Sequence, residues 1–176
     1  MGDGMSKNLI LYFSRKGENY FGGKIINIAK GNTEIAAEFI QQAVGGDLFE
    51  IVTKKPYAPE YKKCIEEAKK EMLASARPSL QAYVSDISDY DTIFICGPCW
   101  WGTFPMAVFS QLEQLDWIGK KVTVLMTHEG SGLGNSMRDI RNFCKGATVC
   151  DGLAVIGSEV KSSKSSIGAW AKKVVA

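Results

Sequence analysis

The chain has 176 residues, of which 45% are hydrophobic, and its formal net charge at pH 7 is +2. This length and composition predict one domain over residues 1–176 with a sizeable core, and we expect residues 1–5 to form a disordered leader. The small charge excludes a nucleic-acid partner, and no apolar run approaches the roughly 18 residues of a membrane span.

Apolar runs typical of buried strands alternate with segments of helical period along the chain. The expected strands cover residues 8–14, 47–53, 91–97, 120–127 and 148–156. The expected helices cover residues 33–44, 60–75, 105–115, 135–144 and 165–175. Strands that alternate with helices predict a three-layer α/β fold around a doubly wound, five-stranded parallel sheet.

The connection between the first strand and the first helix is unusually long. Residues 15–30 intervene, whereas such connections usually take about two to six residues. We expect this segment to form a flap over a cofactor or substrate, with its glycines as pivots and Tyr20 and Phe21 as covers. A short helix over residues 24–29 that packs on a partner subunit is the alternative.

Small, polar and aromatic residues follow three of the expected strands. The segments are residues 14–17, 97–102 and 127–132. In an open parallel sheet, ligands bind outside the carboxyl ends of the strands. The three segments therefore predict one binding site at this edge.

The sequence Gly31-Asn32-Thr33 immediately precedes the first expected helix. Free backbone N–H groups and the helix dipole at such a point bind an anion without a lysine. Ser14, at the end of the first strand, points toward the same spot. Alone, these residues are more typical of an ordinary helix cap, but together with the other two loops they favour a phosphate site.

Two adjacent tryptophans, Trp100 and Trp101, follow the third strand and precede Gly102. Both cannot face the core of a tight turn, so one is left partly exposed unless a ligand covers it. A flat isoalloxazine ring would supply that cover by stacking. We favour Trp100 because it comes first after the strand, although the sequence leaves both open.

The third loop combines glycines with the single histidine of the chain. Gly130, Ser131 and Gly132 let the backbone approach the polar edge of a ring. His128 lies at the end of the fourth strand, where a protonated or hydrogen-bonding imidazole would tune flavin reduction. A histidine that only caps the strand end or faces solvent is equally compatible with the sequence.

Taken together, these motifs resemble the flavodoxin-like FMN-binding proteins over nearly the whole chain. The matching residues are Tyr12-Phe13-Ser14, Gly31-Asn32-Thr33, Gly97-Pro98-x-Trp100-Trp101-Gly102 and Thr127-x-x-Gly130-Ser131-Gly132. The resemblance implies FMN as the cofactor, its phosphate in the first loop and its ring in the other two, and the strand order 2-1-3-4-5. Most members run Ser/Thr-x-Thr-Gly-Asn-Thr without interruption, so residues 15–30 resemble a subgroup with an insertion at this point.

These motifs define the residues that we expect to contact the cofactor. They are Ser14, Arg15, Asn19, Asn32, Thr33, Pro98, Cys99, Trp100, Trp101, Gly102, Thr127, His128, Gly130, Ser131 and Gly132. His128 is also the one candidate for a catalytic role, as the tuning residue. With one histidine and no cysteine cluster of zinc spacing, we expect no metal site.

Five cysteines without a secretory leader indicate reduced thiols in the cytoplasm. Cys96-Gly97-Pro98-Cys99 matches the thioredoxin tetrapeptide, which belongs at the start of a helix. Because Cys96 ends an apolar strand in this chain, thiol–disulfide chemistry at Cys96 and Cys99 is only a minor alternative.

Two function classes remain open, and both are FMN-binding redox proteins. A flavodoxin-type electron carrier would serve a redox partner protein. An FMN-dependent reductase would use NAD(P)H and a small acceptor such as a quinone. Carrier flavodoxins are strongly acidic, unlike this chain with its pI near 8.2, and residues 15–30 could wall a substrate pocket. We expect a monomer or a homodimer without a membrane partner.

Overall fold

The computed structural model describes residues 7–176, so the leader expected over residues 1–5 lies outside the described residues. The strands are β1 (Asn8–Tyr12), β2 (Gly17–Phe21), β3 (Lys24–Ile28), β4 (Asp47–Glu50), β5 (Thr92–Pro98), β6 (Lys121–His128), β7 (Thr148–Val149) and β8 (Leu153–Ile156). The helices are α1 (Asn32–Val44), α2 (Tyr61–Leu73), α3 (Met106–Leu112), α4 (Ser136–Phe143), the 3₁₀ helix η1 (Gly157–Ser162) and α5 (Lys164–Val175).

The main sheet is parallel and has the order β4-β1-β5-β6, with β7 and β8 both paired to the outer side of β6. With the β2–β3 hairpin set apart, this is the predicted order 2-1-3-4-5. The expected fifth strand is split in two, because Val122 pairs with Val149 whereas Leu125 pairs with Leu153. One extra residue on the outer strand interrupts its ladder.

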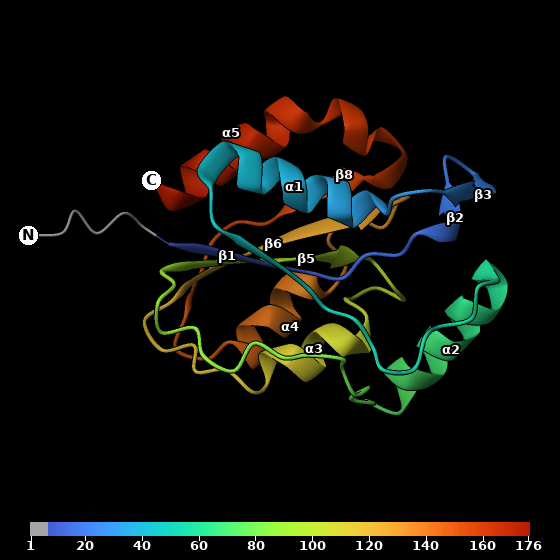
Figure 1. Ribbon diagram of the computed structural model, residues 1–176, viewed down its shortest axis with the longest axis horizontal. Helices are drawn as coiled ribbons and strands as arrows, with labels where there is room; N and C mark the ends of the chain where they lie inside the picture. The colour runs from blue at the N-terminus through green and yellow to red at the C-terminus, as the bar shows by residue number, and fades with distance from the viewer. Residues whose placement is uncertain (1–6) are drawn as a thin grey trace, which may run out of the picture.

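Helices cover both faces of this sheet, which confirms the predicted flavodoxin-like α/β layers (Figure 1). Helices α1 and α5 lie on one face, and α3 and α4 lie on the other. Strand β1 shows why the sheet is buried on both sides: Leu9 and Leu11 pack into one core, whereas Ile10 packs into the other. No helix among residues 7–176 is both long and apolar enough to cross a membrane.

Residues 15–30 contain an antiparallel hairpin, β2–β3, at the carboxyl edge of the main sheet. Gly22 and Gly23 form its turn with φ values of 59° and 88°, a left-handed geometry that glycine adopts readily. The alternative of a helix over residues 24–29 is therefore wrong. The isoleucines of β3 explain the difference, because β-branched residues favour strands over short helices.

Helix α3 is shorter than the expected helix over residues 105–115. It ends at Leu112, whose carbonyl oxygen accepts the indole N–H of Trp117 at 2.9 Å. The last carbonyl groups of a helix have no hydrogen-bond partner within it, and the bond from Trp117 satisfies one of them. Apart from such end effects, each predicted strand and helix of the main sheet is present.

Candidate functional site

A cavity of about 310 Å³ lies at the carboxyl edge of the sheet, where residues of the loops after β5 and β6 meet Asn32 at the start of α1 and Asn19 of the hairpin. Its lining includes nine of the residues predicted to contact the cofactor: Asn19, Asn32, Pro98, Cys99, Trp100, Thr127, His128, Gly130 and Ser131. Tyr20, which was expected as a cover, lines the cavity as well, and three further lining residues were not predicted: Tyr61, Glu129 and Gly157. The loops after β5 and β6 thus come together as the sheet rule predicts, whereas residues 14–17 line a neighbouring cavity.

The first turn of α1 forms one end of this cavity and provides uncompensated backbone donors. Gly31 is the N-cap and supplies no side-chain cap. In the described part of the chain, the N–H groups of Asn32 and Thr33 have no acceptor. An anion placed there would meet these N–H groups and the positive end of the helix dipole.

Ser14 and Gly31 fit closely together beside this turn. The N–H of Glu34 donates to Ser14 Oγ at 3.1 Å, so the hydroxyl proton of Ser14 stays available to a ligand. A Cβ atom at Gly31 would lie only 2.0 Å from Ser14 Oγ. Only glycine therefore fits at this position. Ser14 itself lines a second, neighbouring cavity.

Arg15 does not point to the helix N-terminus, although it was predicted to contact the cofactor. Its Nε donates to the carbonyl oxygen of Glu18 at 2.9 Å, and its Nη2 donates to those of Ala58 at 3.1 Å and Pro59 at 2.8 Å. The guanidinium thereby ties the root of the hairpin to the segment before α2. An anion at the first turn of α1 would therefore meet backbone groups and not this guanidinium.

Trp100 and Trp101 point in different directions. Trp100 lines the cavity and packs perpendicular to Phe13 and Tyr57, with ring centroids 5.0 and 5.1 Å away. Trp101 has a positive φ of 56°, is 45% exposed and donates its indole N–H to Ile65 at 2.8 Å. The turn places one indole inside the site and the other on α2, so Trp100 is the one positioned to stack on a ring.

Other predicted residues lie behind the cavity wall. Thr33 is buried, and its hydroxyl is 2.8 Å from that of Thr127. Gly102 accepts the backbone N–H of Asn135 at 2.6 Å, which joins the tryptophan loop to the start of α4. Neither Thr33 nor Gly102 lines the cavity, and Gly132 does not line it either. Their cofactor contacts stay a prediction.

The hairpin and α2 supply a second aromatic wall. Tyr20 of β2 and Tyr61 of α2 stack with centroids 6.4 Å apart at 26°. Burial raises the pKa of Tyr61, so its hydroxyl is protonated at neutral pH. The helical spacing of apolar residues predicted only that Tyr61 faces inward from a helix. It could not predict that Tyr61 lines the cavity, because this position depends on how α2 packs against the hairpin.

Two carboxylates hold the hairpin over the cavity. Glu18 accepts the backbone N–H of Tyr61 at 3.0 Å and so caps the start of α2. Glu129 accepts the N–H of Ser158 at 2.9 Å through one oxygen and reaches the N–H of Gly22, at the hairpin turn, at 3.4 Å through the other. The predicted covering position of residues 15–30 agrees with this geometry.

His128 stands at the end of β6 and is half-buried. Its Nδ1 accepts the N–H of Gly130 at 2.9 Å, so a proton carried by the neutral ring lies on Nε2. This bond orders the third loop. It also leaves Nε2–H as the group that can donate to a ligand in the cavity.

The cysteines do not form a thioredoxin-type site. Cys96 is fully buried within β5, and this burial raises the pKa of its thiol, whereas a redox-active thiol needs a lowered pKa. Cys99 lines the cavity, and its backbone N–H donates to the carbonyl oxygen of Thr127 at 2.9 Å, so Cys99 extends the pairing of β5 with β6 and does not begin a helix. Within residues 7–176, no group of three or more His, Cys, Asp or Glu side chains could hold a metal ion.

Comparison with known proteins identifies the family of this fold and site. The profile of the flavodoxin family matches residues 23–174. The chain therefore belongs to the flavodoxin family, as the resemblance in the sequence implied. This membership supports FMN as its cofactor, whereas the insertion subgroup stays a prediction. No match was found among curated proteins.

Solved structures show the same fold. A Bacteroides eggerthii protein assigned to the flavoproteins is 27% identical, with a TM-score of 0.76 over 97% of this chain and 99% of its own. Its Bacteroides uniformis counterpart is 26% identical, with a TM-score of 0.76 over 95% and 98%. A Lactobacillus acidophilus flavoprotein, solved in complex with FMN, is 23% identical, with a TM-score of 0.64 over 89% and 97%.

Proposed function

We propose that the chain binds FMN non-covalently and transfers electrons through it, as a redox protein of the flavodoxin type. The observation that carries this proposal is one cavity with an uncapped helix N-terminus at one end and aromatic walls at the other. The first feature suits a phosphate, and the second suits a flat ring. One phosphate site without a dinucleotide fingerprint after β1 favours FMN over FAD.

The residues divide between the two ends of the ligand. Ser14, Asn32 and the N–H groups of the first turn of α1 would hold the phosphate. Trp100 would stack on the ring, with Tyr20 and Tyr61 on the hairpin side. The redox chemistry would be supplied by the bound flavin, because no side chain of the site can carry it.

His128 would tune the reduction of the flavin through Nε2–H. Reduced FMN carries negative charge near neutral pH, and a donor beside that charge stabilises it and raises the midpoint potential. Loss of one such bond, about 1–2 kcal/mol, corresponds to roughly 40–90 mV for a one-electron couple. Spectroelectrochemical titration of the parent and His128→Asn from pH 5.5 to 8.5 tests the role, and overlapping potentials at every pH would remove it.

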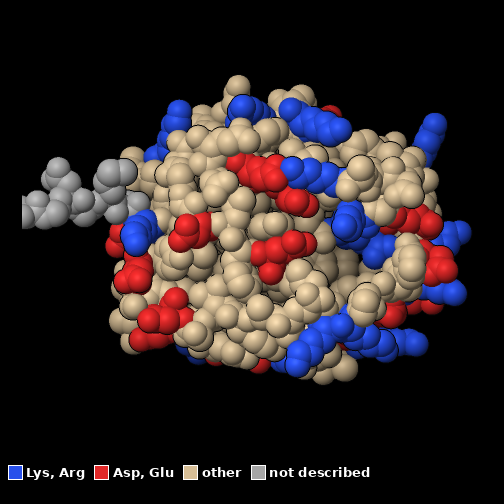
Figure 2. Space-filling model, viewed as in Figure 1, with Lys and Arg blue, Asp and Glu red and all other residues tan. Residues whose placement is uncertain are grey.

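An FMN-dependent NAD(P)H reductase is the second candidate. The hairpin favours it, because Asn19 and Tyr20 wall the cavity where a carrier would present its ring to a partner protein. Charge favours it too: the chain carries +2, and Figure 2 shows acidic and basic side chains interspersed on the displayed face. An acidic carrier docks by electrostatic steering, which this balance does not provide.

One anaerobic experiment separates the two candidates. The protein is loaded with FMN, oxygen is removed, and NADH or NADPH is added while the visible flavin absorbance is followed. Rapid bleaching by either nucleotide supports the reductase. Bleaching by dithionite but by neither nucleotide supports the carrier. A protein that retains no flavin after incubation with excess FMN contradicts both.

A further inference from the structure

A second cavity, of about 590 Å³, lies beside the first. It is formed by the end of β1, the segment after β4 and the root of the hairpin. Trp100 lines both cavities, and it is the one residue common to their linings within the described chain. The insertion and the tryptophan loop thus divide the carboxyl edge into two separate spaces. The volume is in the range of small-molecule sites, about 300–1,000 Å³.

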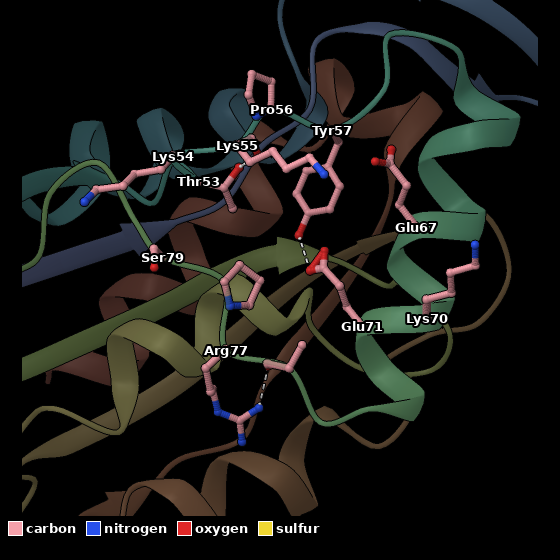
Figure 3. Close-up of a pocket in the computed structure, with 12 residues that line it drawn as sticks. Thr53, Lys54, Lys55, Pro56, Tyr57, Glu67, Lys70, Glu71, Arg77 and Ser79 are labelled. Atoms are coloured by element: carbon pink, nitrogen blue, oxygen red, sulfur yellow. Dashed lines mark hydrogen bonds between the residues drawn. The ribbon is translucent and has the colours of Figure 1, made fainter.

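The inner wall of the second cavity is aromatic and fixed in place. The ring of Phe13 stands nearly perpendicular to those of Tyr57 and Trp100, at 76° and 77°. Phe13 is only 5% exposed. The hydroxyl of Tyr57 donates to Glu71 at 2.9 Å, which holds the end of this side chain in place (Figure 3). A flat apolar ligand would meet a preformed surface at this wall.

The polar rim of the cavity is balanced in charge. Arg15 and Lys16 line the cavity together with Glu18 and Glu50. Arg15 donates through Nε and Nη2 to backbone carbonyls, and one oxygen of Glu18 accepts the N–H of Tyr61, so both side chains are engaged with the protein. Because the rim carries two charges of each sign, it has no net attraction for an ion of either sign and suits an uncharged molecule.

Hydrogen-bond donors remain on the same rim. The side-chain amide of Asn27 makes no hydrogen bond with residues 7–176, and that of Gln81 reaches only the carbonyl of Thr53 at 3.5 Å. Amide N–H groups bond carbonyl oxygens well. A ligand with carbonyl groups at its edge would satisfy them.

The neighbouring cavity in Figure 3, of about 520 Å³, shares Thr53, Pro56 and Tyr57 with the second cavity but does not reach Trp100. Its lining carries four basic residues against two acidic ones, namely Lys54, Lys55, Lys70 and Arg77 against Glu67 and Glu71. It therefore has neither the shared tryptophan nor the balanced rim, which makes it a suitable control site.

We propose that the second cavity binds a flat, uncharged organic molecule with ring carbonyl groups, of the quinone class, in contact with Trp100. Binding requires no flavin, because the cavity is complete in the chain itself. Its role, as the acceptor site of the reductase, rests on the proposed function. A ligand there and a flavin in the first cavity would share the Trp100 indole and would lie on either side of Ser14, and we expect both to bind at once.

The probe is 2,3-dimethyl-1,4-naphthoquinone, because its methyl groups block the positions at which cysteine thiols add to quinones. It is titrated into the full chain with and without FMN and followed by calorimetry and amide chemical shifts. We expect one saturable site in both preparations, with shifts at Phe13, Val52 and Gln81 and none at Gly130 and Ser131.

Two matched variants locate the site. Val52→Trp fills the second cavity, whereas Ser79→Trp places the same side chain in the control cavity. We expect Val52→Trp to lower the affinity for the probe about tenfold or more and Ser79→Trp to change this affinity less than about twofold. The affinity for FMN should be unaltered in both variants. Thermal melting followed by circular dichroism checks that each variant folds. If Val52→Trp does not fold, the amide shifts that the probe causes in the parent protein still locate the site.

Three results would overturn the location of the site: parent-like probe affinity in folded Val52→Trp, displacement of the probe by FMN, or shifts at Gly130 and Ser131. Naphthalene-2-carboxylate, a flat anion without ring carbonyls, tests the ligand class. Binding as tight as that of the quinone would contradict an uncharged carbonyl ligand. Failure of FMN to bind leaves these readouts unchanged, so it is recognised separately as failure of the proposed function.

Discussion

The hydroxyl groups of Thr33 and Thr127 lie 2.8 Å apart and join the first turn of α1 to the carboxyl end of β6. Both side chains are buried. This bond fixes the helix N-terminus against the third loop. The first turn of α1 and the third loop are therefore parts of one rigid arrangement.

Removal of the Ser14 hydroxyl should weaken FMN binding selectively. A charge-assisted bond contributes about 1.5–3 kcal/mol, so Ser14→Ala should lower FMN affinity about tenfold or more. Riboflavin, which lacks the phosphate, should bind as in the parent. Fluorescence titration measures both ligands, with Ser166→Ala on α5 as the control. Equal losses for FMN and riboflavin would place the Ser14 hydroxyl away from the phosphate.

Trp100, and not Trp101, should report flavin binding. Binding should quench tryptophan emission, and Trp100→Phe should abolish most of this quenching, because Trp100 lines the cavity. Trp101→Phe should quench like the parent, because its indole is bonded to Ile65 outside the cavity. Phenylalanine keeps an aromatic ring in each position and limits the loss of packing. Parent-like quenching in Trp100→Phe would refute stacking by this residue.

Glu129 should hold the hairpin closed. Its carboxylate accepts N–H groups from Ser158 and Gly22, so Glu129→Ala should speed amide hydrogen exchange at the turn, near Gly22, and accelerate FMN release several-fold. Bound FMN should slow exchange across β2 and β3 in the parent. Glu159→Ala, on the exposed side of η1, is the control. If FMN leaves amide hydrogen exchange in the hairpin unchanged, the hairpin does not cover the bound cofactor.

The Tyr57–Glu71 pair predicts a pH-dependent change in stability. Burial is the main cause that raises the pKa of Glu71 above its ordinary 4.5. The folded state thus binds the Glu71 proton more tightly, so this contribution to stability is present below pH 4.5 and is lost as pH rises through the raised pKa.

Glu71→Gln removes the half-buried charge and keeps an oxygen that can accept the Tyr57 hydroxyl (Figure 3). The variant should be more stable than the parent at pH 7, by less than about 1 kcal/mol because the group is partly solvated, and the gain should vanish by about pH 4. Urea unfolding at both pH values measures it, with the exposed Glu66→Gln as the control. A gain that persists unchanged at the lower pH would show that burial of the Glu71 charge is not its cause.

The sheet and most of the site could be predicted because both follow from local patterns. Apolar runs such as residues 91–97 define buried strands, and the carboxyl-edge rule then brings their loops together. The split of the last strand could not be foreseen, because it depends on how Leu153 shifts by one residue against β6. Pairing register is a tertiary property that composition does not encode.

The errors in predicting the site residues have the same cause, which is tertiary contact. Tyr61 reaches the cavity because α2 packs against the hairpin, a contact between segments far apart in sequence. Arg15 was expected near the anion because of its charge, yet the carbonyls of Ala58 and Pro59 hold its guanidinium. Trp101 is turned outward by its positive φ. In each case, a partner that no local pattern reveals decides the direction of the side chain.

The identity of the bound flavin tests the central claim most directly. The protein is purified, incubated with excess FMN and FAD in equal amounts, freed of unbound ligand and heated, and the released flavin is separated by chromatography. The single anion site at α1 predicts that the released flavin co-elutes with FMN in near one-to-one ratio with the chain. Release of FAD, or of no flavin at all, would contradict FMN as the cofactor of this protein.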